Sequence, residues 1–328
     1  MEKKKLLIFG GITLVIIIGL FWSGTGKVNR LSFATAGTGG TYFPMGGGVA
    51  DFFTKKVDGV EVTAQTSGGS AENLRLIQNG DVDMAWANGS EIYWAWNGQK
   101  FFEDKEHDKV RIVPFAWTNT YHFAALEESS ITSVEDFRGK KVGIGPQGSG
   151  AAIFGETYLK DVGLWDDIKP MYLPPADQSS SFKDGGIDVF GYFSGFPMAA
   201  MIDISSVRNI YLLDLQKLGD ESGFTDKYPF YIRTNIPAGT YKGQTNNVGS
   251  YSNLTYWVAS EDVSEDIIYR LVKELYSEEG LKHMTNVHRR SQELSTDKIL
   301  NGVEQLDVPL HPGTIKFLNE KGIEVNDL

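Results

Sequence analysis

Short apolar segments of strand length alternate along the chain with longer segments whose apolar residues recur at helical spacing. Leu31–Ala36, Val60–Gln65, Val82–Ala87 and Val110–Ala116 have the pattern of strands, and the helical pattern runs from about Tyr42 to Lys56 and from Ala71 to Gln78. Strands that alternate with helices in this way predict a mainly parallel α/β sheet.

The same pattern recurs later in the chain. Lys141–Gly145, Met171–Leu173 and Ile187–Tyr192 are predicted strands, with helices over 151–162 and 179–183. Leu76–Met84 also resembles Ser181–Val189, because each combines a helix end, a glycine turn and a Val-Asp or Ile-Asp pair before a strand. This weak repeat predicts two similar lobes.

Two further strand-like segments, 120–127 and 253–259, are not followed by helices, and we expect them to cross between the lobes. Helices predicted near 265–276 and 311–321 would then pack back on the first lobe. The alternative is one larger mixed sheet. The expected organisation is an N-terminal segment (1–30), a first lobe (31–120 and 256–328) and a second lobe (121–255) that contains the hinge strands.

The N-terminal segment has the pattern of a membrane-targeting sequence. Lys3–Lys5 precede the uncharged run Leu6–Trp22, which would span about 26 Å as a helix. The lysines should stay in the cytoplasm, so the rest of the chain would lie outside it. Two alternatives remain open, an anchor over 6–22 and a cleaved signal peptide that leaves the protein secreted or periplasmic.

Composition narrows the classes of partner. The length of 328 residues suggests about two domains, and the hydrophobic fraction of 41% is enough for a sizeable core. The formal net charge of the chain is −11. Five of its cations lie in the first 30 residues, so the remaining chain is more acidic still. We therefore expect no nucleic-acid partner and membrane contact through the N-terminal segment only. The absence of cysteine excludes disulfides and thiolate metal sites, and no cofactor or metal is expected.

Glycine-rich loops provide the candidate binding chemistry. Gly37–Tyr42 joins a strand to a helix, and Ser67–Ser70 repeats the arrangement, with Ser70 as an expected N-cap and Asn73 reaching back to it. Backbone N–H groups at the positive end of a helix bind anions. The alternative is that these glycines only form tight turns.

Other motifs argue for binding and against catalysis. Gly143–Gly148 matches G-x-G-x-x-G, but an anion site fits this mid-chain loop better than a dinucleotide site. Ser194 is not in a G-x-S-x-G motif, and the histidines lack metal-site spacing. Trp86 and Phe193 end predicted strands, where open α/β sheets bind ligands. No enzymatic activity is expected.

Several of these segments resemble one family. Thr35–Gly46 and Gln65–Leu76 resemble the two N-terminal signatures of TAXI solute-binding proteins, which serve one class of TRAP transporters. Asp136–Gly150 is similar to the family's second-lobe loop, and Ile236–Tyr241 and Pro309–Gly313 resemble its C-terminal motifs. The resemblance runs in order from about Leu31 to Ile323.

The resemblance implies an α/β fold of the periplasmic-binding-protein type II class, with two lobes crossed by two hinge strands. Its expected function is to capture a small carboxylate, such as a dicarboxylate, keto acid or glutamate-like solute, and to deliver it to a polytopic TRAP permease. A membrane-anchored sensor with the same fold is the alternative.

Carried over position by position, the resemblance implies a binding site on loops of both lobes. Asn88 aligns with the start of a Gln-Ser-Asp triplet, so the family's aspartate is absent, which favours a solute without an amino group. The expected ligand-binding residues are Thr38, Gly39, Gly40, Thr41, Tyr42, Ser67, Gly69, Ser70, Asn73, Trp86, Asn88, Gln147, Gly148, Ser149, Gly150, Phe193, Ser194 and Gly195.

Overall fold

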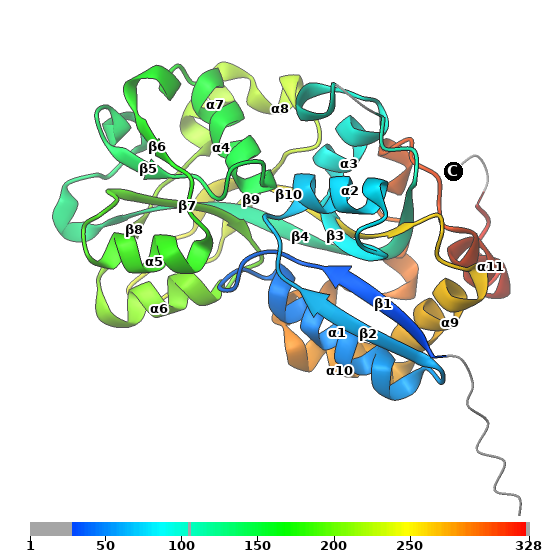
Figure 1. The fold of residues 1–328 in the computed structure, drawn as a ribbon. Helices are drawn as coiled ribbons and strands as arrows, with labels where there is room; N and C mark the ends of the chain where they lie inside the picture. The colour runs from blue at the N-terminus through cyan, green and yellow to red at the C-terminus, as the bar shows by residue number, and fades with distance from the viewer. Residues whose placement is uncertain (1–27, 104–105, 326–328) are drawn as a thin grey trace, which may run out of the picture.

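The computed structural model of the chain describes residues 28–103 and 106–325. Within these residues the strands form one mixed 10-stranded sheet with helices packed on it (Figure 1). The strand order is β2-β1-β3-β10-β4-β7-β5-β6, with β8 beside β4 and β9 beside β10. The expected membrane segment, 6–22, lies outside the described residues. No helix in the described part of the chain is long and apolar enough to span a bilayer.

The first half of the sheet consists of parallel strands with helices that follow each of them. β1 pairs in parallel with both β2 and β3, as the alternating pattern predicts. C-terminal helices complete this half, because α9 and α10 pack on α1. Its elements are β1 (Asn29–Ala34), α1 (Tyr42–Lys56), β2 (Val60–Gln65), α2 (Ser70–Asn79), β3 (Met84–Asn88), α3 (Gly89–Trp96), α9 (Glu265–Leu275), α10 (Glu278–Val287) and α11 (Pro312–Glu320).

The second half lies at the other end of the sheet, on the left of Figure 1. β5 pairs in parallel with β6 and β7, so the order β6-β5-β7 repeats β2-β1-β3. Its elements are β5 (Lys141–Gly143), α4 (Gly150–Asp161), β6 (Lys169–Met171), α5 (Pro175–Lys183), β7 (Val189–Ser194), α6 (Ala199–Val207), β8 (Ile210–Leu212), α7 (Gln216–Ser222), α8 (Phe224–Lys227) and β9 (Ile232–Ile236).

Two long strands, β4 (Val110–Leu126) and β10 (Val248–Ser260), run through both halves. β10 pairs with β3 near its end and with β9 near its start, and β4 pairs first with β10 and then with β7. The crossing strands are therefore present, but the separate segments expected at 110–116 and 120–127 are one strand. The expected lobe boundaries, 120/121 and 255/256, fall inside β4 and β10.

The sequence repeat has a structural counterpart in two aspartates. Asp83, just before β3, accepts hydrogen bonds from the backbone N–H (2.7 Å) and hydroxyl (2.8 Å) of Ser32 in β1. Asp188, just before β7, accepts one from the backbone N–H of Lys141 at the start of β5 (2.7 Å). Each aspartate thus ties the start of its own strand to the neighbouring parallel strand.

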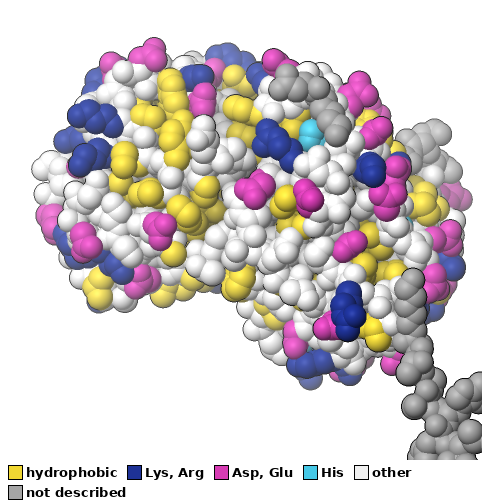
Figure 2. All heavy atoms as spheres, viewed as in Figure 1, with side chains coloured by type: hydrophobic (Ala, Val, Ile, Leu, Met, Phe, Trp, Pro, Cys, Tyr) yellow, Lys and Arg dark blue, Asp and Glu magenta, His cyan; other side chains and the backbone are white. Residues whose placement is uncertain are grey.

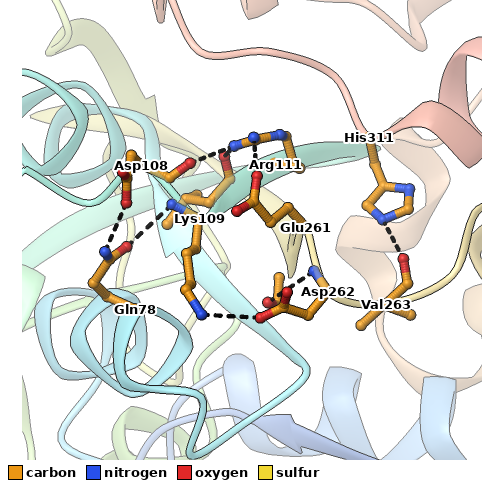
Figure 3. Close-up of polar contacts among 10 residues, drawn as sticks. Gln78, Asp108, Lys109, Arg111, Glu261, Asp262, Val263 and His311 are labelled. Carbon is orange, nitrogen blue, oxygen red and sulfur yellow. Dashed lines mark hydrogen bonds and ion pairs between the residues drawn. The ribbon is translucent and has the colours of Figure 1, made fainter.

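The ends of the crossing strands that lie in the first half are held by polar contacts (Figure 3). Gln78 of α2 donates to the Asp108 carboxylate (2.8 Å) and accepts from the backbone N–H of Lys109 (3.1 Å). The Lys109 ammonium pairs with Asp262, just beyond β10, at 3.0 Å. These contacts join α2 to the start of β4 and the end of β10.

Candidate functional site

The N-termini of α1, α2, α3 and α4 converge between the two halves of the sheet, on a small cavity. Its volume is about 20 Å³, which is room for about one water molecule. Three of these helices belong to the first half and α4 belongs to the second. The cavity is lined by Ala36, Gly40, Thr41, Tyr42, Gly69, Ser70, Asn88, Asn119, Ser149, Gly150, Ala151, Tyr192 and Phe193.

Helix ends give this cavity a positive electrostatic character. Each helix N-terminus carries a partial positive charge and N–H groups without a partner inside the helix. Ser149 is the N-cap of α4, and its hydroxyl accepts from the Ala152 N–H at 3.0 Å. Because several such ends meet here, the arrangement favours a bound anion.

Glycines let the two halves approach closely at the cavity. A Cβ added to Gly150 of the second half would lie 2.5 Å from the Asn88 amide nitrogen and 3.2 Å from the Ser70 hydroxyl of the first. A Cβ added to Gly40 would lie 3.2 Å from the Tyr192 ring. These loop glycines therefore do more than form turns, because larger residues would hold the halves apart.

A buried hydrogen-bond network forms the floor of the cavity. The Tyr42 hydroxyl donates to the Asn88 side-chain oxygen (2.7 Å) and lies 3.0 Å from the Ser70 hydroxyl. Thr255 also donates to that oxygen (2.8 Å), and Asn119 donates to Thr255 (2.6 Å). Burial raises the pKa of Tyr42, so its phenol stays protonated and remains a donor. The network fixes Asn88 with its amide nitrogen toward Gly150.

A second set of contacts joins the halves directly. The Thr41 and Ser194 hydroxyls are 2.8 Å apart, and the Gly195 N–H donates to the Thr41 hydroxyl (2.9 Å). The Ala200 N–H donates to the Gly39 carbonyl at 3.2 Å. Residues expected to contact a solute, Thr41 and Ser194 among them, are therefore hydrogen-bonded across the halves in this conformation.

The structure brings part of the expected site together. Thr38 and Gln147 are exposed. Gly39, Ser67, Gly148 and Gly195 lie in the same loops, and Ser194 is the last residue of β7, but none of these lines the cavity. The expected residues that do line it are Gly40, Thr41, Tyr42, Gly69, Ser70, Asn88, Ser149, Gly150 and Phe193.

Two expected ligand contacts have structural roles instead. Asn73 donates to the carbonyls of Thr35 and Trp86, both at 2.8 Å, and accepts from the Ser67 hydroxyl at 2.6 Å. It therefore ties α2 to β1 and β3 and does not reach back to Ser70, which is the first residue of α2 and not its N-cap.

Trp86 is the other such residue. It is fully buried against Phe33, Phe115 and Trp117, and its indole N–H donates to the Tyr42 carbonyl at 3.1 Å. It supports α1 from the core and has no exposed surface for a ligand.

Sequence reasoning missed some residues at the cavity. Asn119 falls in the gap between the two segments that turned out to be β4, and Tyr192 directly precedes the expected Phe193. Glu91, in the first turn of α3, is buried beside the cavity wall. One feature of the sequence indicates that Glu91 is unusual: it is the only charged residue in the stretch Met84–Trp96.

His122, on a strand shared by the two halves, is neutral. His122 is fully buried in β4, where its ring nitrogens contact the Thr120 carbonyl (3.0 Å) and the Tyr241 hydroxyl (2.9 Å). Burial lowers the pKa of His122 to about 4. Across residues 28–103 and 106–325, no group of three or more His, Cys, Asp or Glu side chains is placed to hold a metal ion. On the face drawn in Figure 2, charges of both signs are interspersed.

Three solved structures are similar to this chain. The structure of a periplasmic transporter matches with a TM-score of 0.52 and 13% identity over 88% of this chain and 99% of its own. DctP7, a Bordetella pertussis extracytoplasmic solute receptor binding pyroglutamic acid, matches with a TM-score of 0.47 and 12% identity over 90% of this chain and 92% of its own. The alkanesulfonate-binding protein SsuA from Xanthomonas axonopodis pv. citri has a TM-score of 0.46 and 12% identity over 92% of this chain and 96% of its own.

At these identities the similarity concerns the fold alone. The match to the periplasmic transporter confirms the expected α/β fold of the periplasmic-binding-protein type II class. A family model matches residues 33–322, which is most of the chain. The chain belongs to the NMT1-like family.

Proposed function

We propose that this protein is an extracytoplasmic solute-binding subunit that captures a small carboxylate between two lobes and delivers it to a membrane permease. The observation that carries this proposal is the convergence of the α1, α2, α3 and α4 N-termini on one cavity between the halves of the sheet. Such an arrangement stabilises an anion without a lysine or arginine in the cavity wall.

Capture requires the halves to separate. The cavity of about 20 Å³ is too small for a solute of several carbon atoms, so entry would involve opening and closing around the crossing strands β4 and β10. The lobes would be residues 31–120 with 256–328, and residues 121–255. A carboxylate would first meet the helix ends of the first lobe, and closure would add α4.

Selectivity would come from buried hydrogen-bonding groups. A solute that leaves Ser70 or Asn88 unpaired on closure would lose roughly 1–3 kcal/mol for each group. A solute that pairs them would be held without that penalty.

The type of transporter is proposed from the resemblance to TAXI proteins. It supports a TRAP-type secondary transporter, in which a polytopic permease receives the solute. Export or anchoring through residues 6–22 would place the protein outside the cytoplasm, next to that permease.

The test is to purify the full chain under native conditions, denature it, and identify the released small molecules by mass spectrometry. A carboxylate released in a ratio near one per chain is expected. Release of no solute, together with no thermal shift across a panel of small carboxylates, would refute carboxylate capture. Co-purification of a tagged full chain with a polytopic membrane protein tests delivery to a permease.

A further inference from the structure

Glu91 is a buried carboxylate without a partner at the edge of the cavity. Its side chain is fully buried, and neither of its oxygens accepts a hydrogen bond from any described residue. It forms no ion pair within the described residues. Buried charges are normally paired, so an unpaired one needs an explanation.

The Glu91 carboxylate lies where the two halves meet. A Cβ added to Gly150 would be 3.2 Å from a carboxylate oxygen of Glu91 and 2.5 Å from the Asn88 amide nitrogen. Gly150 and Asn88 both line the cavity, and Gly150 is the first residue of α4 in the second half. Separation of the halves would therefore uncover Glu91 at the wall of the cleft.

Helix electrostatics alone do not account for this burial. Glu91 is in the first turn of α3, where a negative charge is favourable. Glu72 of α2 and Glu265 of α9 are also in first turns, and both are exposed. In this chain a glutamate can therefore interact favourably with a helix N-terminus while its carboxylate stays in solvent.

The groups around Glu91 are neutral. Burial raises the pKa of Glu91 to about 7, and the nearby polar side chains of Asn88 and Ser90 only partly oppose this rise. Tyr231 of the second half is also buried, and its hydroxyl has no hydrogen-bond partner among the described residues. No cation among residues 28–103 and 106–325 pairs with the carboxylate, so a compensating cation would have to come from a bound molecule.

We propose that Glu91 is a specificity-determining residue, and that the solute carries an ammonium group that pairs with the Glu91 carboxylate. The carboxylate of the same solute meets the helix N-termini. This inference rests on the proposed function and narrows it, because it selects zwitterionic solutes. It reverses the preference drawn from the absent aspartate, since Glu91 supplies a carboxylate close to that position.

The test compares matched probes that differ only in the amino group: L-glutamate with glutarate, and L-leucine with 4-methylpentanoate. Their affinities for the full chain are measured by calorimetry at pH 8, where Glu91 is mostly ionised. In at least one pair the amino compound should bind at least about 10-fold more tightly than its partner. Glu91→Gln should reduce that preference about 10-fold, whereas Glu265→Gln, an isosteric change remote from the cavity, should leave it intact.

The outcomes separate the two proposals. Tighter binding of glutarate or 4-methylpentanoate than of the amino compounds refutes the role of Glu91 and leaves carboxylate capture intact. Binding of none of the probes, with no carboxylate released on denaturation, refutes both. The comparison within the unsubstituted chain does not depend on the folding of Glu91→Gln, whose melting temperature is checked separately.

Discussion

The two halves of the sheet share a strand order, β2-β1-β3 and β6-β5-β7, but they differ in what they bring to the cavity. The first half directs the N-termini of α1, α2 and α3 at it, whereas the second half directs only that of α4. α5, which occupies the place of α2 in the repeat, begins with Pro175, which lacks an N–H, and packs near Gly37. The same strand order therefore supplies several N–H donors to the cavity in the first half, and mainly residues that cover the cavity in the second half.

This difference assigns separate tasks to the two halves. Donors and the Glu91 carboxylate gather in the first half, so recognition should depend mostly on its residues. The second half contributes Gly150, Tyr192 and Phe193, which close the cavity. Substitutions in the first half should therefore reduce recognition of the solute, whereas substitutions in the second half should hinder closure of the cavity.

The largest effect on solute affinity should come from a substitution that prevents the second half from approaching the first. Gly150→Ala would place a methyl group 2.5 Å from the Asn88 amide nitrogen, and overpacking of this kind typically costs about 1–3 kcal/mol. We expect the affinity for the released solute to fall about 10- to 100-fold, as measured by calorimetry, without loss of the fold. Gly47→Ala is the matched control, because a Cβ there meets nothing within 4 Å. Equal affinities for the two variants would contradict closure at Gly150.

Removal of one hydroxyl from each half sharpens the comparison. Ser70 accepts from the Asn88 N–H (3.2 Å) and contacts Tyr42, whereas Ser149 caps α4. Ser70→Ala should weaken binding roughly 10-fold and Ser149→Ala several-fold, by the usual size of a lost buried hydrogen bond. Ser264→Ala removes the N-cap of α9 and controls for loss of a cap alone. A larger effect at Ser149 would reverse the assignment of recognition to the first half.

The buried Glu91 carboxylate of the first half should make the folding stability of the protein depend on pH. The pKa of Glu91 is about 7 in the folded chain against an ordinary value of 4.5, so the folded state holds the proton more tightly. The stability contributed by Glu91 therefore falls as pH rises from about 4.5 to 7 and is lowest above 7. Without solute, Glu91→Gln should melt about 5 °C above the unsubstituted protein at pH 8, and the gap should narrow toward pH 5.

Comparison of the two proteins removes the contribution of other groups. Burial lowers the pKa of His122 and of His311 to about 4, so each histidine destabilises both proteins as pH falls below about 6.5. A melting-temperature gap that is the same at pH 5 and pH 8 would be inconsistent with the raised pKa.

The smallest effects should come from the repeated aspartates. Asp83 holds the N–H and hydroxyl of Ser32, and Asp188 holds one N–H of Lys141. Asp83→Asn should lower the melting temperature by about 2 °C and Asp188→Asn by less, because the Asp83 hydrogen bonds are partly buried whereas the Asp188 hydrogen bond is exposed and contributes little. Neither should alter solute affinity. A marked loss of affinity in either variant would show that strand alignment is coupled to the cavity.

Local patterns were sufficient for most of the fold. Apolar periodicity predicted α1 and β2 with the bounds that the structure has. The glycine turns located α2 to within one residue at each end and gave the end of α5, but α5 begins four residues before the predicted start. The pattern failed where tertiary contacts decide the outcome. β4 was divided in two because polar residues 118–120 interrupt its apolar run. These residues instead pair with β10, and Asn119 joins the cavity network.

The candidate site was less predictable for a related reason. Backbone geometry drew attention to the glycine loops, and their residues do reach the cavity. Sequence spacing does not reveal which polar side chains turn inward, so Asn73 was assigned to a ligand although it bonds to backbone carbonyls. Glu91 was overlooked because a glutamate in a first helical turn is usually exposed, and only its apolar surroundings indicated otherwise.

The position of β10 has a consequence for the order of folding. β10 lies between β3 and β4, which are consecutive along the chain, and it is made more than 100 residues after them. Until it arrives, β3 and β4 each have an unpaired edge that carries buried aromatic residues such as Trp86 and Trp117. Formation of the sheet must therefore wait for nearly the whole chain, and non-local pairing of this kind makes folding slow. A polypeptide that ends before Val248 would keep both edges open and would be prone to aggregate.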